Sequence, residues 1–439
     1  MIFLTRFIII FTIVVSSNIL GLIDADNLVF GGFVLQDASI LCLLVYFICT
    51  YKTRIERNSK LLLPIFVYVI LTTLIILFMP FRGDISLIRA FQVGRMFYFL
   101  LLAFVIEDNI YFEKSNKFVL WCIFCVGLYF SLISIGYYIY PIRAFVDIFE
   151  GIGLYSNEKG NSMRHGMRSN NAMLFVHLSF VICFLQILLN KKNRNFKNYV
   201  IVCIFLLAMF TQGFRAIMYT ILCSLFIVII FIFKNSIKKK IFNYKFVIKN
   251  VFLVFILVFV VNALLDNAIV DIFVFTMKEL LGDVDVNSGG TLDGRLQRAL
   301  IYQIPVLQDN PWFGVGFVHK SSGLAKELGY IDDITRIRSL YNMDFGYVSL
   351  WLMFGFWGIC AILVSMVKSI IYLLKFSQKA FMNNILQYAV ILLAFLVCNY
   401  SWGVLMQPIG LIILGFSAGL ASGERLLMLK KGRLVVIKN

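Results

Sequence analysis

The sequence predicts an all-α polytopic membrane protein with about twelve transmembrane helices and one large outer loop that contains an amphipathic helix. Apolar residues make up 61% of its 439 residues and charged residues only 14%, whereas about a quarter of a soluble domain is charged. Apolar runs long enough to cross a bilayer recur along the chain. One connection, residues 266–345, is far longer than an ordinary loop.

Runs of about 17 to 25 apolar residues predict the spanning helices. They occupy residues 7–23, 32–51, 61–79, 86–106, 118–140, 171–189, 199–213, 215–233, 246–265, 346–367, 385–402 and 404–421. The first run lacks a small-residue cleavage site and further spans follow it at once, so we expect a retained helix rather than a signal peptide. The chain then divides into spans one to nine (1–265), the large loop (266–345), and spans ten to twelve with a tail (346–439).

The loops between these spans predict the orientation, because short connections rich in Lys and Arg stay on the cytoplasmic side. The basic connections and the basic tail fall on the same side of a twelve-helix count, so both termini are expected to be cytoplasmic. They are 52–60, 190–198, 234–245, 368–379 and 423–439. The formal net charge of +17 is therefore mainly a signal of topology, and nothing in the sequence indicates nucleic-acid binding.

The two basic residue types are distributed unequally between the two sides. With this topology the inner side holds 19 Lys and 6 Arg, and the outer side 4 Lys and 11 Arg. Arginine differs from lysine by its planar fork of donors, which binds phosphate in a bidentate manner. We therefore predict that the outer face handles a phosphorylated or otherwise anionic group; the alternative is chance placement with snorkelling side chains.

Arg215 lies in a short outer connection, "TQGFR", which is all that separates two predicted spans. It falls on the first turn of the following helix, where the helix dipole also favours an anion. An arginine at this depth with no evident acidic partner indicates a functional site, and a simple interfacial anchor is the alternative.

The segment "GGTLDGRLQRALIYQIPVLQDNPWFGVGF", 289–317, predicts an amphipathic helix lying on the membrane or on the protein. Asp293 can cap it, Gln303 is the only polar member of its apolar face, and Asn310 with the following proline ends it. The "GVG" turn allows the backbone to approach a ligand closely. Near the start of this helix are two arginines, Arg295 and Arg298.

A third segment, 336–358, carries polar residues into the outer end of the tenth span. They are Arg336, Arg338, Tyr341, Asn342 and Asp344, of which Asp344 is the acid best placed to accept a proton from a hydroxyl.

Other basic residues on the outer side could hold a second anion or a sugar: Arg164, His165, Arg168, Arg89 and Arg95. His177 and His319 have no neighbours at metal-ligand spacing, and all nine cysteines fall inside apolar runs, which favours structural roles. Neither a P-loop nor a metalloenzyme motif is present, so we expect no metal and no cofactor.

Three stretches resemble the O-antigen polymerase and O-antigen ligase superfamily of bacterial inner membranes. "TQGFRAIMYTIL" resembles its "SR" hairpin, with Phe214 where serine is usual. "GRLQRALIYQIPVLQDNPWFGVGF" resembles its "R…P…GxG" loop, and "YNMDFGYVSLWLMFGFWG" its "HN…G…G" entry to the next helix. The resemblance covers the whole architecture, but its sequence-specific part is short.

The resemblance implies a metal-independent glycosyltransferase that transfers a glycan from undecaprenyl diphosphate to an acceptor sugar hydroxyl at the periplasmic face. Arg215 and Arg295 match the arginines that hold the diphosphate in this family. Tyr341 replaces the histidine that serves as general base in the ligases, which favours a polymerase and leaves Asp344, His319 or the acceptor's own environment as the base. A ligase of the same superfamily and a lipid-linked oligosaccharide flippase are the alternatives.

The expected partners are an undecaprenyl-diphosphate-linked oligosaccharide and membrane lipid. The sequence leaves open whether a chain-length regulator protein binds.

Overall fold

The computed structural model of the chain describes the following residues: 1–17, 35–55, 60–83, 85–139, 154–155, 168–169, 173–190, 193–211, 215–237, 299–328, 341, 345–377, 383–400 and 403–430. The predicted ninth span and much of the predicted large loop lie outside them.

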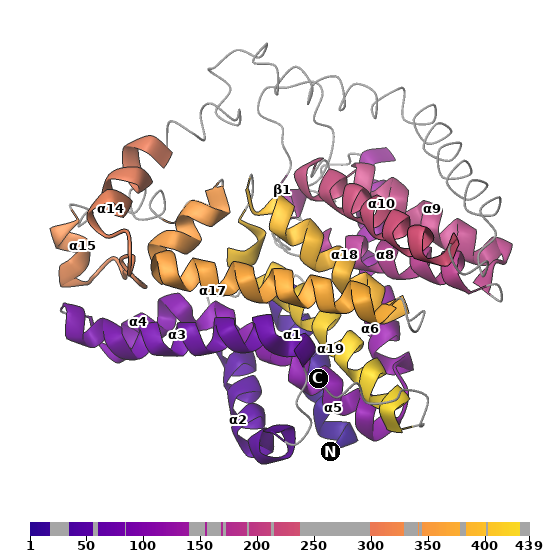
Figure 1. Cartoon of the computed structure of the whole chain (residues 1–439), viewed down its shortest axis with the longest axis horizontal. Coiled ribbons are helices and arrows are strands. Elements are labelled where there is room, and N and C mark those ends of the chain that lie inside the picture. The colour runs from indigo at the N-terminus through magenta and orange to yellow at the C-terminus, as the bar shows by residue number, and fades with distance from the viewer. Residues whose placement is uncertain are drawn as a thin grey trace, which may run out of the picture.

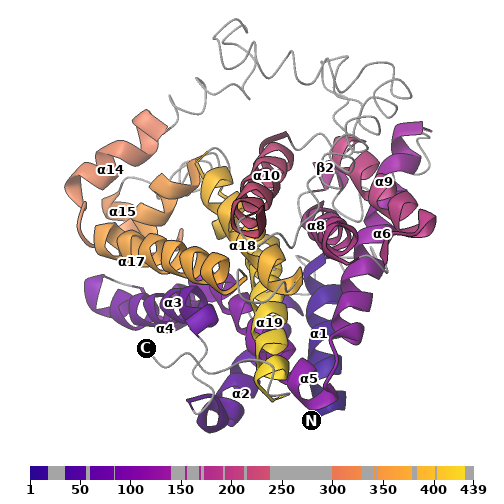
Figure 2. The same ribbon diagram turned by 45° about the vertical axis from the view of Figure 1, so that its right-hand side comes forward.

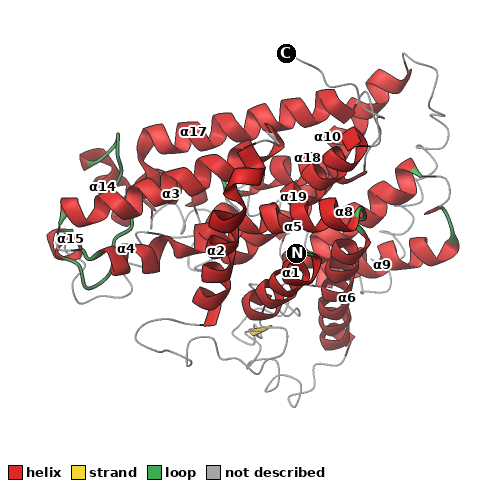
Figure 3. Ribbon diagram, turned by 90° about the horizontal axis from the view of Figure 1, so that it is seen from below, coloured by secondary structure: helices red, strands yellow, loops and turns green. Residues whose placement is uncertain are grey.

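The regular secondary structure of the described residues is helical except for one pair of two-residue strands, and loops join the helices (Figure 3). The strands β1 (Leu154–Tyr155) and β2 (Arg168–Ser169) pair antiparallel. The helices of the first half are α1 (Ile2–Ser17), α2 (Leu35–Ile55), η1 (Lys60–Leu62), α3 (Leu63–Arg82), α4 (Leu87–Gly94), η2 (Arg95–Leu101), α5 (Leu102–Glu113), α6 (Lys117–Ile139), α8 (Met173–Leu189), α9 (Phe196–Thr211) and α10 (Arg215–Ile237). Those of the second half are the π-helix η4 (Ala299–Gln303), α14 (Ile304–Asp309), α15 (Gly323–Glu327), α17 (Gly346–Ser377), α18 (Asn383–Cys398), η6 (Val404–Met406) and α19 (Pro408–Lys430).

The lengths of the helices agree with an all-α, multi-pass membrane protein. Five stretches of described helix are long and apolar enough to cross a membrane, and six more apolar helices are shorter. Together they coincide with every predicted span except 246–265. Three helices run well past their predicted ends: α5 to Glu113, α17 to Ser377 and α19 to Lys430. Lys368 and Lys375 were predicted in the connection 368–379 but lie within α17, where both are exposed. A long lysine side chain tolerates such a helix end, since its ammonium can reach the polar interface.

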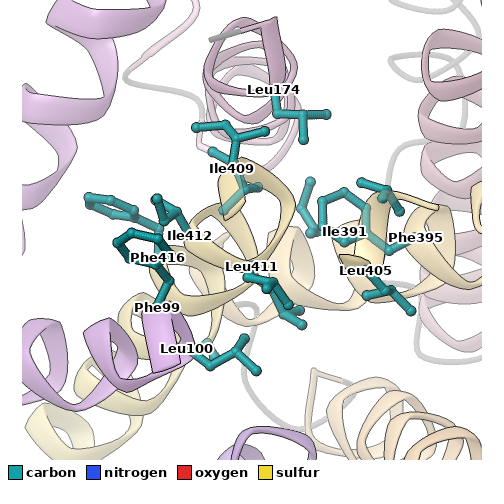
Figure 4. Packing of buried hydrophobic residues seen from close by; sticks show 14 of the residues in the cluster. Phe99, Leu100, Leu174, Ile391, Phe395, Leu405, Ile409, Leu411, Ile412 and Phe416 are labelled. Atoms are coloured by element: carbon teal, nitrogen blue, oxygen red, sulfur yellow. The ribbon is translucent and has the colours of Figure 1, made fainter. Parts of the chain in front are cut away.

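The helices α18 and α19 lie between α3 and α17 on one side and α6 and α8 on the other (Figure 2). Their apolar side chains form the centre of the core with Phe99 and Leu100 of η2 and Leu174 of α8 (Figure 4). Small residues permit close packing here: a Cβ atom at Gly419 of α19 would lie 2.7 Å from the carbonyl oxygen of Ala103 in α5. Glycines four residues apart allow this approach of two membrane helices.

Polar contacts join the ends of several helices at one end of the bundle. Arg6 of α1 forms an ion pair of 2.9 Å with Glu113 at the end of α5. At the start of α18, the amide of Asn384 donates to Glu424 near the end of α19. The start of α1 and the ends of α5 and α19 therefore lie near the same end of the bundle, as an alternating topology requires (Figure 1).

Candidate functional site

The helix α17 is broken at Gly355. Its φ of 72° and ψ of 174° lie in a region that only glycine adopts readily. In a continuous helix the amide of Phe356 would donate to the carbonyl of Leu352. The break separates these two groups, so both need partners from elsewhere, because unpaired backbone groups are costly in a membrane.

A single stretch of chain, Asn310 to Val318 (the 310–318 segment), supplies both partners. The amide of Val315 donates to the Leu352 carbonyl at 2.7 Å, and the amide of Phe356 donates to the Pro311 carbonyl at 3.1 Å. The indole Nε1 of Trp351 also donates to the Pro311 carbonyl, at 2.6 Å. The 310–318 segment therefore completes the hydrogen bonding of the broken helix.

The predicted "GVG" turn lies within this segment, and both its glycines have positive φ. A Cβ atom at Gly314 would lie 2.3 Å from the Leu352 carbonyl oxygen, and one at Gly316 would lie 2.3 Å from Sδ of Met79. The close backbone approach expected here toward a ligand is an approach to α17 and α3.

Arg82, the last residue of α3, holds the segment from its other side. Its guanidinium donates to the Gly314 carbonyl at 2.6 Å and to Oδ1 of Asn310 at 2.7 Å. The sequence analysis did not single out Arg82. Its position directly before Gly83, at the end of an apolar run, was the available signal, because cations favour helix C-termini.

The helix before the segment ends as predicted, at Asp309, with Asn310 at its C-cap. Gln303, the polar member of its inner face, is fully buried, and its side-chain nitrogen donates to Oγ of Ser349 in α17 at 2.8 Å. This hydrogen bond gives the buried amide nitrogen a partner and fixes η4 against α17.

Tyr341 joins the segment before α17 to the 310–318 segment. Its hydroxyl donates to the Gly316 carbonyl at 2.6 Å and accepts from the amide of Val318 at 3.0 Å. Two of the three stretches quoted for the resemblance therefore touch each other through Tyr341.

A small basic cluster follows the 310–318 segment, formed by Arg89, His319 and Lys320. The guanidinium of Arg89, on the first turn of α4, donates to the Ser321 carbonyl at 3.2 Å. Burial lowers the pKa of His319 from its ordinary value, and the positive charges of Arg89 and Lys320 lower it further. The His319 ring therefore stays neutral to a lower pH than a free histidine does.

The hydrogen bonds of His319 select one tautomer of the neutral ring. The backbone amide of Ser321 donates to its Nδ1 at 3.3 Å, and the Ser321 hydroxyl lies 2.7 Å from the same atom. Since Nδ1 is an acceptor, the proton of the neutral ring is on Nε2. In this state His319 offers a hydrogen-bond donor rather than a base.

Arg95, another predicted anion contact, has a carboxylate partner. Its NH1 lies 2.6 Å from Oδ2 of Asp37, whose side chain is 2% exposed. This ion pair links η2 to α2 and neutralises the arginine. It gives Arg95 a structural role that the sequence did not suggest.

Arg215 begins α10, as expected, although its side chain lies outside the described residues. Near the start of α10, the hydroxyl of Thr220 interacts with the thiol of Cys398 at the end of α18. The start of α17 meets the same end of α18, because the Tyr347 hydroxyl donates to the Leu396 carbonyl. The starts of α10 and α17 therefore lie near one another, beside the end of α18.

The remaining predicted site residues can be placed only in part. Arg168 lies in β2 opposite Tyr155. Several lie outside the described residues: Arg164, Arg295, Arg298, Arg338, Asn342 and Asp344. Among the residues that the structure does describe, no three His, Cys, Asp or Glu side chains come together as a metal site would require.

Comparison with known proteins found no match, either among protein-family models or among curated proteins.

Proposed function

We propose that the chain polymerises lipid-linked oligosaccharide repeat units at the outer face of a bacterial inner membrane. In this proposal a growing glycan on undecaprenyl diphosphate is transferred to an acceptor sugar of the next repeat unit. The product is an O-antigen or another surface polysaccharide.

One contact carries the proposal: the Tyr341 hydroxyl bound to the backbone of Gly316 and Val318. It joins two of the three stretches that resemble the superfamily. His319 and Lys320 directly follow Val318, and Arg89 of α4 donates to the nearby Ser321 carbonyl. Cationic donors next to a rigid loop suit an anionic substrate such as a diphosphate.

The reaction needs no external oxidant or energy source. The oxygen of the acceptor hydroxyl attacks the anomeric carbon of the donor sugar and forms a new C–O bond. The bond from that carbon to the diphosphate oxygen breaks, and the diphosphate leaves with the electron pair. The hydroxyl proton passes to a base.

In the proposal, Arg215 and Arg295 bind the diphosphate and stabilise the charge that develops as it leaves. Arg89 and the Nε2–H of His319 would contact a second anionic or sugar oxygen. Since Nδ1 of His319 already accepts from Ser321, Asp344 becomes the better candidate for the base.

The length distribution of the glycan in a deletion strain tests this function. If the chain is a polymerase, the deletion strain makes only single-repeat glycan on its acceptor. The wild-type chain then restores a ladder of longer glycans on a gel. Long glycan that is not attached to its acceptor would instead indicate a ligase. Repeat units that never reach the outer face would indicate a flippase, and the proposal would be wrong.

A further inference from the structure

The outward face of η4 and the start of the 310–318 segment is strongly apolar, although Gln308 and Asp309 at the end of α14 are also exposed. The inward face is formed by Ala299, Gln303, Val306 and Leu307, all of them buried. On the outward face Leu300 is 54% exposed, Ile301 64%, Trp312 54% and Phe313 76%. An exposed apolar surface of this kind on a protein indicates a binding surface.

This apolar face continues onto α17. The ring of Trp312 stacks on that of Trp357 with centroids 5.9 Å apart, and it meets Phe356 edge to face at 5.6 Å. Trp357 is itself 61% exposed and belongs to a helix that is long and apolar enough to cross a membrane. In a membrane, exposed apolar side chains on such a helix face lipid, and the adjoining Trp312 shares that surface.

The end of α3 extends the same surface. Phe78 and Phe81 are 68% and 89% exposed. The next residue, Arg82, binds Asn310 and Gly314. The 310–318 segment is thus bonded between the end of α3 and the break in α17.

The segment also meets the main requirement for entering a bilayer. Non-helical backbone is tolerated there only when its polar groups have partners. The amides of Val315 and Gly316 both donate to the Leu352 carbonyl, and the Pro311 and Gly314 carbonyls accept from Phe356 and Arg82. Between Ala299 and Val318 the only charged residue is Asp309.

We propose that residues 299–313 insert into the interfacial region of the lipid bilayer. Leu300, Ile301, Trp312 and Phe313 would contact lipid acyl chains there. The large outer loop would then be anchored in the membrane, and the basic cluster of Arg89, His319 and Lys320 would be held close to the lipid surface. Tryptophan is the residue most suited to this depth, since its ring is both apolar and a hydrogen-bond donor.

Quenching of tryptophan fluorescence tests the insertion. The full chain and its Trp312→Phe variant would be placed in phosphatidylcholine–phosphatidylglycerol vesicles, with and without bromine on the acyl chains. The difference between the two proteins isolates the emission of Trp312. The matched control is Trp351→Phe. It removes another tryptophan, whose indole nitrogen donates to the Pro311 carbonyl in the wild-type chain.

Insertion predicts that brominated lipid quenches the Trp312 emission and that aqueous iodide does not. A second reporter, Ile301→Trp, should gain an emission with the same behaviour. Quenching by iodide alone would mean that the face lies in water. Protection from both quenchers would mean that protein covers it, either another part of this chain or a partner. Each of these two results would overturn the proposal.

Discussion

At the scale of single residues, Tyr341 makes two hydrogen bonds to the 310–318 segment that a histidine could not make with one atom. Its hydroxyl serves as a donor to Gly316 and an acceptor from Val318 at the same time. A neutral histidine nitrogen is either a donor or an acceptor, so one nitrogen could not make both contacts. A tyrosine at this position therefore favours holding the loop over accepting a proton.

Removal of this hydroxyl should loosen the 310–318 segment. Tyr341→Phe leaves a buried carbonyl and a buried amide without this partner, which costs about 1–3 kcal/mol for each unsatisfied group. We expect a lower unfolding temperature in detergent and faster proteolysis of the outer loop. Tyr400→Phe is the control, because Tyr400 is 63% exposed. Equal stability of the two variants would contradict the role given to Tyr341.

The role of His319 can be separated into donor and base by two substitutions. Glutamine can place an N–H near the position of Nε2 but cannot accept a proton at neutral pH, whereas alanine does neither. We expect His319→Gln to keep most of the glycan ladder and His319→Ala to lose it. If both variants fail equally at normal protein level, the donor role is wrong.

The pH dependence gives a second test of the same residue. Burial and the charges of Arg89 and Lys320 lower the pKa of His319, so the ring stays neutral to a lower pH than a free histidine. Removing the charge of Arg89 would raise that pKa. If His319 is a donor, the acid limb of the pH–activity profile keeps its position in Arg89→Gln; if it is the base, the limb moves to higher pH.

At the scale of elements, the break in α17 is the feature on which the candidate site depends. Gly355→Ala would place a Cβ atom 2.4 Å from the Trp312 carbonyl oxygen, at a φ that alanine rarely adopts. The backbone strain alone costs on the order of 1–3 kcal/mol. We expect a lower unfolding temperature and release of the 310–318 segment from α17, seen as new proteolytic cleavage there.

The control for this substitution is Gly136→Ala in α6. A Cβ atom at Gly136 meets no other atom within 4 Å, and alanine favours a helix more than glycine does. This variant should be as stable as the wild-type chain. A Gly355→Ala variant that is equally stable would show that the break does not need glycine.

Hydropathy predicted the elements well because a bilayer demands long apolar helices. The break within α17 was not predictable in this way: Gly355 and Gly358 both lie in the run "FGFWG", and only Gly355 interrupts the helix. The ion pair of Arg95 with Asp37 was missed because its members are far apart in sequence and neither stands in a motif. Contacts between distant residues need the packing of the helices, which apolar periodicity does not encode.

For the whole molecule, the topology can be tested with reporter fusions. Alkaline phosphatase is active only outside the cytoplasm, and green fluorescent protein folds to its fluorescent form only inside. The alternation of spans predicts active phosphatase after residues 83 and 320, and fluorescence after residues 115, 190 and 430. The opposite pattern at residue 320 would place the candidate site on the wrong side for a periplasmic reaction.

The site itself was predictable only in outline. Outer arginines and three short motifs indicated one end of the bundle, and the contacts of Tyr341, Tyr347 and Cys398 bring parts of those motifs together there. Arg82 and the Nδ1 contacts of His319 were not predicted, because both depend on carbonyl and amide groups of a folded loop.

The most direct test of the central claim is the glycan ladder produced by Arg215→Lys in the deletion strain. Lysine keeps the charge but lacks the bidentate fork, so we expect a loss of polymer of roughly a hundredfold, as for removal of a transition-state donor. The control is Arg194→Lys, because Arg194 lies on the predicted cytoplasmic side and donates to the backbone carbonyls of Ile187 and Leu188 near the end of α8. Long glycan from Arg215→Lys, at the same protein level as the control, would contradict a phosphate-binding arginine at this position.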